Sequence, residues 1–598
     1  MRRYRTALGL ALAAFLVYNA NFSYQTSEDS LPAKLLPYSI LRNHDFYLDW
    51  MPKTGRNSQE THSLIHREGR VLSGYPVVAP VLAAPFYAPF VLYRHFRHYP
   101  DMDAFHDESD GLEKLSASAL TAASVAFLYL ALETLFGRRR ALFLSVLYAF
   151  ATSTWYTSSQ ALWQHGPAEL LLAILLWLVV CHENGPPMVF AGMGAVAALL
   201  SADRPPNVVF ALALAVWCAL RHPRRLPLIV AGAMPVAALV VAYDLVYFHT
   251  WLGSYGGFVS VYGKERTPLL PGIAARLLAP GIGLLVYSPF LVALACLPAA
   301  RVARAPAAQG SSPRLLRGDS SRGDQSSLPL FLRLALVACA VLTILYGRAS
   351  WPAGFGPRYM TDMLPILVAA LGPLLPLLSG AARGLFFLLA AWAILLQAIL
   401  VFWAGLPATY FHTWAASEFP PWTMIRYGAP AYPELLAPRL GIPLDGGGIF
   451  FPSRLLWHAK IPLSQCRVGW GPSDVPSRLT AGETTPVEIT VTNASEVTWM
   501  VFNVSYHLTG LAAGMPAVFE GPRTPLPILF PPGRTVTVNC RVQPPADLPP
   551  GPYRIDFDVV QERNTWFSWA GVATLPREVT IEAPRSRNRD AGSRAGGR

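Results

Sequence analysis

The feature that most constrains the fold is a series of long apolar segments separated by short arginine-rich loops. Of the 598 residues, 53% are hydrophobic and only 14% are charged. A soluble domain carries about a quarter charged residues, because its surface must be hydrated. A helix needs roughly 20 apolar residues to cross the hydrocarbon core of a bilayer. We therefore expect an integral membrane protein with many spans.

The apolar segments predict eleven membrane-spanning helices. Another apolar stretch, residues 75–93, contains four prolines and is expected to be a helix that lies against the membrane or dips into it. The eleven spans are expected at residues 4–20, 114–136, 140–156, 167–182, 187–202, 207–220, 226–248, 280–300, 329–347, 359–378 and 382–405.

Arginine clusters predict the orientation of these spans, because loops rich in Lys and Arg stay on the cytoplasmic side. With eleven spans, every such cluster falls on one side, whereas a full span at residues 75–93 would move the "FGRRRA" cluster outside. The first segment is expected to be an uncleaved anchor, since no A-x-A cleavage site precedes Asn21. The net charge of +12 belongs to these loops, so no nucleic-acid partner is expected. The predicted location is a bacterial inner membrane, with membrane lipids as partners. The clusters are Arg2, Arg3 and Arg5; Arg138 to Arg140; and Arg221, Arg224 and Arg225.

The hydropathy pattern changes after Gly405. The helical domain is expected to span residues 1–405, with an external first loop at 21–113, and an interfacial connector is expected at 406–463. From residue 464 to 584, apolar residues alternate with polar ones, as in Val487, Ile489 and Val491, which predicts a small β-sandwich outside the cell. Residues 585–598 are expected to form a disordered tail. A disulfide between Cys466 and Cys540 is allowed there but not required.

The predicted external face collects the residues that could carry chemistry. Asp29 and Glu28 directly follow the first span, and acidic residues at this depth are functional candidates, although an ordinary interfacial carboxylate is the alternative. His165 could hydrogen-bond a sugar or a phosphate, or could be a structural histidine.

Several external cations accompany these acids. An arginine fork matches phosphate oxygens, while snorkelling to lipid head groups is an equally good explanation for any single one. A carboxylate that deprotonates an acceptor hydroxyl, with cations that stabilise a phosphate leaving group, fits transfer of a sugar from a polyprenyl carrier. The cations are Arg204, Lys264, Arg266, Arg348 and Arg358. No Cys/His spacing suggests a metal site.

The order of several motifs resembles a known group of membrane enzymes. The motifs are "SEDSLPAKLLPYSILRNHDFYLDW", "GRVLSGYPVVAPVLAAPFYAP", "EKLSASALTAASVAFLYLALETLFGRRRA", "LWQHGPAELLLAILLW", "GSYGGFVSVYG", "APGIGLLVYSPFLV" and "WPAGFGPRYMTDMLP". In this order they resemble the GT-C superfamily, and more closely the bacterial dolichyl-phosphate-mannose protein mannosyltransferase-like proteins. The resemblance covers nearly all of residues 1–405.

The resemblance implies an inverting glycosyltransferase that uses a polyprenyl-phosphate-linked sugar. Asp29 matches the catalytic aspartate of the first external loop, and inversion implies direct displacement without a covalent glycosyl-enzyme. Arg358 and Tyr359 belong to the best-matched cationic motif, whereas Val77 and Val78 replace the Pro-Gly that is common in relatives. No cofactor is expected, and a divalent metal is left open. The acceptor could be a glycan, a lipid or a protein. The expected substrate-binding residues are Glu28, His165, Arg204, Lys264, Arg266, Arg358 and Tyr359.

The C-terminal segment resembles an immunoglobulin-like module appended to bacterial glycosyltransferases. The matching stretches are "AGETTPVEITVTNASEVTW", "GPRTPLPILFPPGRTVTVNCRV" and "PPGPYRIDFDVVQERNTWFSWAG". Trp566 and Phe567 could stack on a sugar or pack in the core. Two other functions remain open for the whole chain: a flippase for polyprenyl-linked sugar, and a non-catalytic anchor that binds glycan or protein.

Overall fold

A computed structural model describes the chain as two units, each considered by itself. The described residues are 2–21, 27–51, 63–97, 102–251, 253, 268–297, 328–348, 356–403 and 461–583, with gaps in the last range at 462, 498, 501, 513–518, 528, 546–547 and 562–564. The described helices from α1 to α16 belong to the first unit, and the strands from β3 to β14 belong to the second.

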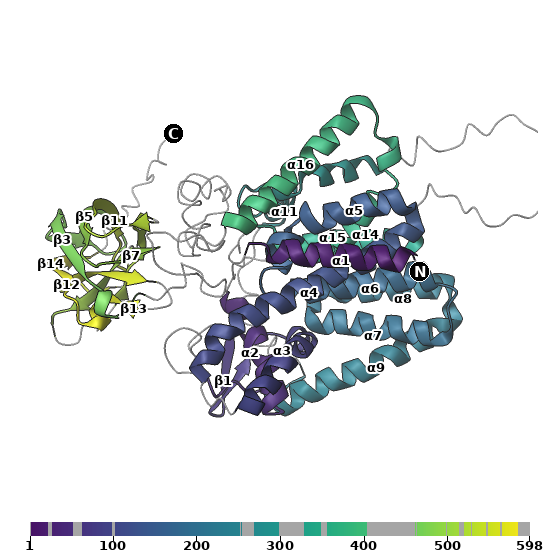
Figure 1. Ribbon diagram of the computed structural model, residues 1–598, viewed down its shortest axis with the longest axis horizontal. Helices are drawn as coiled ribbons and strands as arrows, with labels where there is room; N and C mark the ends of the chain where they lie inside the picture. Colours follow the sequence, from purple (N-terminus) through teal and green to yellow (C-terminus); the bar gives the residue numbers. More distant parts are fainter. Residues whose placement is uncertain are drawn as a thin grey trace, which may run out of the picture. The chain divides into compact units, whose positions relative to one another are not determined.

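The first unit is helical, with helices packed side by side along much of their length (Figure 1). The longer helices are α1 Arg2–Asn19, α2 Leu31–Arg42, α3 Val78–Arg97, α4 Met102–Phe136, α5 Arg138–Phe150, α6 His165–His182, α7 Pro187–Asp203, α8 Val208–Arg221, α9 Leu226–Tyr243, α11 Leu269–Leu278, α14 Leu330–Arg348 and α16 Gly380–Trp403. The short elements that bear on the site are η1 Glu28–Ser30, η2 Thr154–Ser158, η3 Pro205–Asn207, η5 Asp244–Phe248, η7 Arg358–Met363 and α15 Leu364–Ala370.

Five helical segments in the described part of the chain are long and apolar enough to cross a membrane. They are Ser109–Phe136, His165–His182, Pro223–Phe248, Leu330–Arg348 and Gly380–Phe402. Four shorter apolar helices accompany them: Val78–Tyr93, Pro187–Asp203, Pro205–Arg221 and Leu269–Leu278. The chain is thus built as a helical membrane protein, but the prediction of eleven spans is not confirmed.

Three of the predicted spans are broken rather than continuous, and in the segment 140–156 α5 ends at Phe150 before η2 begins at Thr154. The other two breaks involve prolines. Residues 280–300 form α12 Leu284–Tyr287 and then η6 Pro289–Cys296, and residues 359–378 form η7, α15 and η8 Leu375–Leu377. Prolines explain the breaks, because proline lacks the amide hydrogen that an uninterrupted helix needs. Pro289 begins η6, and Pro376 lies within η8. Residues 75–93, in contrast, form the predicted helix, α3.

The predicted external first loop contains a helix and a hairpin that the sequence did not reveal. Helix α2 runs through this loop, and strands β1 Leu64–Arg67 and β2 Arg70–Ser73 pair antiparallel, with Leu64 opposite Ser73. Leu35, Leu36 and Tyr87 are buried in one hydrophobic cluster that joins α2 to α3. The loop therefore has its own core, which holds the start of α2 in a fixed place.

The helices bring the arginine clusters together at one end of the unit. The Tyr18 hydroxyl, near the end of α1, donates to the Ala149 carbonyl oxygen near the end of α5 at 3.2 Å, so these two helices point the same way. Arg3 interacts electrostatically with Glu133 near the end of α4. We call this the arginine end, defined by Arg3, Arg138 to Arg140, Arg221 and Arg383. The opposite end, which holds Asp29 and Arg358, is called the Asp29 end.

Helices α7 and α9 cross with their backbones almost in contact. A Cβ atom on Gly194 would lie 1.9 Å from the Ile229 carbonyl oxygen, and one on Gly232 would lie 1.8 Å from the Ala191 carbonyl oxygen. Only glycine fits at these two positions. Small residues allow such close approach between helices in membranes, where lipid tails are as apolar as the helices themselves. Elsewhere α9 is largely uncovered, with Ile229 its one buried residue.

The second unit is built from mainly antiparallel sheets over one core. Its strands are β3 Val468–Ser473, β4 Arg478–Thr480, β5 Thr485–Asn493, β6 Trp499–Met500, β7 Phe502–Gly510, β8 Phe519–Glu520, β9 Thr524–Pro525, β10 Leu529–Phe530, β11 Thr535–Val542, β12 Gly551–Gln561, β13 Thr565–Trp566 and β14 Leu575–Glu582. One sheet has the order β11-β5-β3, with Val487 opposite Cys540. The larger sheet has the order β4-β14-β12-β7-β8, with β14 and β4 parallel. Residues from both sheets share one buried cluster, so the unit is a sandwich.

The structure of the sandwich bears on three expectations. Val487, Ile489 and Val491 are all buried, which confirms the period-two pattern. Trp566 and Phe567 are also buried, at 5% and 0% exposure, so packing rather than sugar stacking is their role. Cys466 and Cys540 both lie in the shared core as free thiols, so the disulfide that was allowed does not form.

Candidate active site

Asp29 lies in the short turn η1 between α1 and α2. The turn closes through the Ser30 hydroxyl, which donates to the Ser27 carbonyl oxygen at 3.1 Å, and Pro32 then starts α2. The Asp29 side chain is 23% exposed. Its Oδ1 accepts a hydrogen bond from the Tyr75 hydroxyl at 2.7 Å, and its Oδ2 lies 2.6 Å from Arg358 Nη1. The carboxylate is thus held on two sides while part of it stays accessible.

Arg358 is the cation that faces Asp29. Its guanidinium lies 5.4 Å from the centre of the Trp163 ring and 5.3 Å from that of Tyr359, within the range of cation–π attraction. Burial alone would lower the Arg358 pKa, but the Asp29 carboxylate and the Tyr359 hydroxyl together raise that pKa above its usual range. The guanidinium therefore stays charged although only 14% of the side chain is exposed.

A second carboxylate, Asp362, organises a buried polar cluster one turn further along η7. Arg204 Nη1 lies 2.5 Å from Asp362 Oδ2, and Asn207 Nδ2 donates to the same oxygen at 2.9 Å. His165 Nδ1 lies 2.7 Å from Asp362 Oδ1 and 2.9 Å from Arg204 Nη1. Because an ionised carboxylate can only accept, an N–H at His165 Nδ1 would donate to Asp362, and the same nitrogen could then not accept from Arg204. Asp362 is fully buried, so these partners compensate its desolvation.

Tyr359 connects the cluster around Asp29 with the cluster around Asp362. Its ring centre lies 5.3 Å from the Arg358 guanidinium, 5.9 Å from that of Arg204 and 4.8 Å from that of Arg276. Arg276 Nε also donates to the Tyr346 carbonyl oxygen at 3.2 Å, which fixes its position. Three cations from three parts of the chain thus surround one aromatic ring beside Asp29.

A third buried group ties α2 to α4. Lys34 Nζ lies 2.8 Å from Asp110 Oδ1, and their side chains are only 2% and 4% exposed. On the next turn of α4, Glu113 Oε1 accepts from the Leu162 backbone amide at 3.0 Å. Lys34 is five residues after Asp29, so this ion pair fixes the helix that starts just after the candidate base.

The structure brings together some of the predicted site residues and leaves others aside. Asp29, Arg358 and Tyr359 are in contact as a group. His165 and Arg204 lie in the adjoining Asp362 cluster, where both are tied to that carboxylate rather than free at the surface as expected. The side chain of Glu28, and Lys264 and Arg266, lie outside the described residues.

Sequence reasoning missed the residues that hold these groups in place: Tyr75, Lys34, Asp110, Asn207 and Asp362. For Asp362 a signal was present, because an ionisable residue within a predicted span is itself a functional candidate. Among the described residues, no group of three or more His, Cys, Asp or Glu side chains is arranged to hold a metal ion.

Comparisons with known proteins give a limited result. No family model and no curated protein matches the chain. Among solved structures, the chain is similar to ArnT from Cupriavidus metallidurans bound to undecaprenyl phosphate, at 15% identity and a TM-score of 0.44, over 73% of this chain and 70% of that one. It is also similar to a β-glucosidase from Listeria innocua, at 18% identity and a TM-score of 0.15, over 20% of this chain and 16% of that one. Likeness at this level does not establish a common fold.

Proposed function

We propose that the protein is an inverting glycosyltransferase that moves a sugar from a polyprenyl-phosphate-linked donor to an acceptor hydroxyl at the outer face of a bacterial inner membrane. The observation that carries this proposal is the contact of Asp29 with Arg358 and Tyr75. It joins a partly exposed carboxylate to a guanidinium with free hydrogen-bonding capacity, since the buried Arg358 Nε has no hydrogen-bond partner among the described residues.

The reaction needs one proton acceptor and one site for developing negative charge. Asp29 takes the proton as the acceptor O–H bond breaks, and the acceptor oxygen bonds to the anomeric carbon of the sugar. The bond from that carbon to the phosphate oxygen breaks, and its electron pair leaves with the polyprenyl phosphate. Arg358 stabilises this leaving group, because a guanidinium can bind two phosphate oxygens at once.

The pairing of Asp29 with Arg358 also suggests the order of events. A carboxylate bound to a guanidinium is a weak base, because the cation stabilises its ionised form. When a donor phosphate binds Arg358, it competes with Asp29 for the same N–H groups. Donor binding would then leave Asp29 more basic, while Tyr75 continues to orient it.

Asp29→Asn tests the proposal, because an amide keeps the shape of the side chain but cannot accept the proton. In membranes supplied with a radiolabelled polyprenyl-phosphate sugar, this change should lower transfer by about 10²- to 10⁴-fold. The matched control is Asp49→Asn, since Asp49 is another carboxylate of the first loop, paired with Arg70 at 2.8 Å. That variant should keep transfer within about twofold.

One outcome would reject Asp29 as the base, and two others would reject enzymatic transfer. Undiminished transfer with Asp29→Asn would show that Asp29 is not the base. Movement of labelled donor across the membrane without any new glycosidic bond would favour the flippase alternative. Comparing cell-envelope glycans with and without the chain would name the sugar and the acceptor, and would reveal a non-catalytic anchor if no glycan changed.

A further inference from the structure

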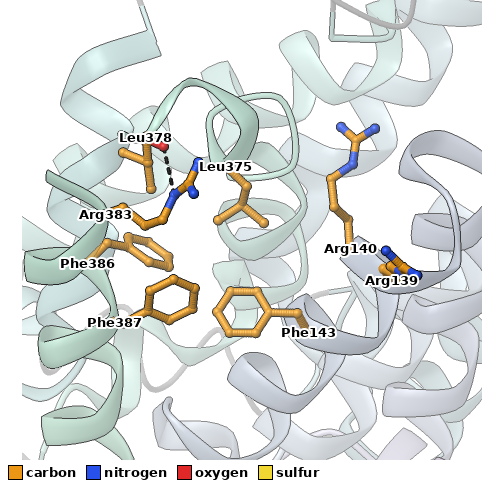
Figure 2. Close-up of a pocket in the computed structure, with 8 residues that line it drawn as sticks. All are labelled: Arg139, Arg140, Phe143, Leu375, Leu378, Arg383, Phe386 and Phe387. Atoms are coloured by element: carbon orange, nitrogen blue, oxygen red, sulfur yellow. Dashed lines mark hydrogen bonds between the residues drawn. The ribbon is translucent and has the colours of Figure 1, made fainter. Parts of the chain in front are cut away.

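A pocket at the arginine end lies between α5 and α16, far along the helices from Asp29. Its volume is about 200 Å³, and it is lined by Arg139, Arg140, Phe143, Leu375, Leu378, Arg383, Phe386 and Phe387. Figure 2 shows the three phenylalanine rings gathered beside Arg383, with Arg139 and Arg140 coming from the facing helix. We propose that this pocket binds the phosphate head group of an anionic phospholipid.

The charges of the pocket call for an anion from outside the protein. Three of its eight lining residues are arginines, and none is acidic. Among the described residues, no carboxylate lies within ion-pair distance of Arg139, Arg140 or Arg383. Arg383 Nε donates to the Leu378 carbonyl oxygen at 2.9 Å, which fixes the side chain and leaves the other guanidinium N–H groups available. Basic pockets between membrane helices on the cytoplasmic side bind phospholipid head groups.

The apolar part of the pocket favours a lipid over a free phosphate. The ring centres of Phe143 and Phe387 lie 5.4 Å apart, and those of Phe386 and Phe387 lie 6.0 Å apart, so the floor is a continuous aromatic surface. A free inorganic anion gains nothing from such a surface, whereas the glycerol and first methylenes of a phospholipid would bury apolar area on it.

The surroundings of the pocket fit the rest of a lipid molecule. A volume of about 200 Å³ is below the roughly 300 Å³ of a drug-sized site, so a head group fits while acyl chains stay outside. The pocket lies at the start of the candidate span Gly380–Phe402. Further along α16, four exposed apolar side chains extend away from it: Leu385, Leu388, Trp392 and Leu395. This strip would carry the chains.

The test measures lipid binding by the full-length protein in neutral detergent, with phosphatidylglycerol as the probe and native mass spectrometry as the readout. The variant Arg139→Gln/Arg140→Gln/Arg383→Gln should bind about 100-fold more weakly, because each arginine near an anionic head group contributes about fivefold. The matched control Arg3→Gln/Arg221→Gln/Arg224→Gln removes the same charge at the same end outside the pocket. It should change binding by less than about twofold.

One further variant and two competitors complete the test. The variant Arg139→Lys/Arg140→Lys/Arg383→Lys keeps the charge and should keep binding within about tenfold, which guards against a folding defect in the glutamine variant. Phosphatidylcholine, which has no net charge, should not compete, and neither should inorganic phosphate at millimolar concentration. Equal binding by the glutamine variant and the control, or competition by either probe, would overturn the proposal.

Discussion

The two ends of the helical unit treat their charges in opposite ways. At the Asp29 end, three buried cations each have a carboxylate beside them: Arg358 pairs with Asp29, Arg204 with Asp362 and Lys34 with Asp110. At the arginine end, Arg139, Arg140 and Arg383 share a pocket with aromatic rings and no acid. These three cations are neutralised by acids of the described chain, whereas the three arginines of the pocket are not.

The difference reflects what each end must do. Buried ions need compensation from the protein itself, because desolvation of an unpaired charge costs several kcal/mol. Partly exposed arginines at a membrane surface can instead be neutralised by lipid head groups. The paired charges therefore fix the geometry of a site, whereas the unpaired ones form a surface that becomes complete only with lipid.

Among changes that leave Asp29 in place, the largest expected effect comes from removing the cation that faces it. Arg358→Gln should reduce sugar transfer by about 10²- to 10³-fold, because a preorganised donor to the leaving phosphate is lost. Arg358→Lys keeps the charge but not the two-pronged geometry, so it should recover only part of this loss. Rates measured with the radiolabelled donor in membranes would check both. Equal rates for lysine and glutamine would show that charge at this position is irrelevant.

Removing the carboxylate of the second cluster should mainly affect stability. Asp362→Asn removes the carboxylate that pairs with the buried Arg204, and the expected cost is about 3–5 kcal/mol in the free energy of unfolding. Thermal unfolding in detergent would measure it. His165→Gln, which keeps the Arg204 pair, is the control and should cost clearly less. If both variants unfolded at the wild-type temperature, the cluster would not hold η7.

The Lys34–Asp110 pair allows a cleaner comparison through a double-mutant cycle. Lys34→Met and Asp110→Leu should each destabilise strongly, because each removes the ion-pair partner of a buried charge. The double change should be less harmful than the sum of the two, by about 0.5–3 kcal/mol, since neither charge of the pair then remains. Additive losses in thermal unfolding would mean that the two side chains do not interact.

The smallest effect is expected at the arginine end. Arg139→Gln in neutral detergent should change the free energy of unfolding by no more than about 0.5 kcal/mol, because the side chain is exposed and has no acidic partner among the described residues. The same thermal unfolding assay would check it. A cost as large as that of Asp362→Asn would mean that the two ends do not differ in the way described above.

Local patterns predicted the parts of the fold that depend on local physics. Alternation identified Val487, Ile489 and Val491 as one buried face, and hydropathy located α4, α6 and α16. The segments 280–300 and 359–378 were wrongly predicted as continuous helices. Mean hydropathy does not detect that a proline lacks the amide hydrogen an uninterrupted helix needs.

The site was only partly predictable for a different reason. Asp29 was singled out by its position after the first span and Arg358 as an external cation, and motif order then supported both. Their contact joins residues more than 300 positions apart in the chain, which no local pattern predicts. Asp362 was overlooked because it lies inside an apolar run. Its partners Arg204 and Asn207 come from a distant part of the chain. Long-range pairs of this kind depend on packing, which a single sequence does not display.

The glycines at the crossing of α7 and α9 have a consequence for how this membrane domain can vary. Protein covers α9 along one narrow line only. The absence of a side chain at Gly194 and Gly232 therefore determines the position of this whole outer helix. An alanine at Gly194 or Gly232 would wedge the pair apart and admit lipid between them. The periphery of the domain thus tolerates changes on its lipid-facing sides but almost none at these two backbone positions.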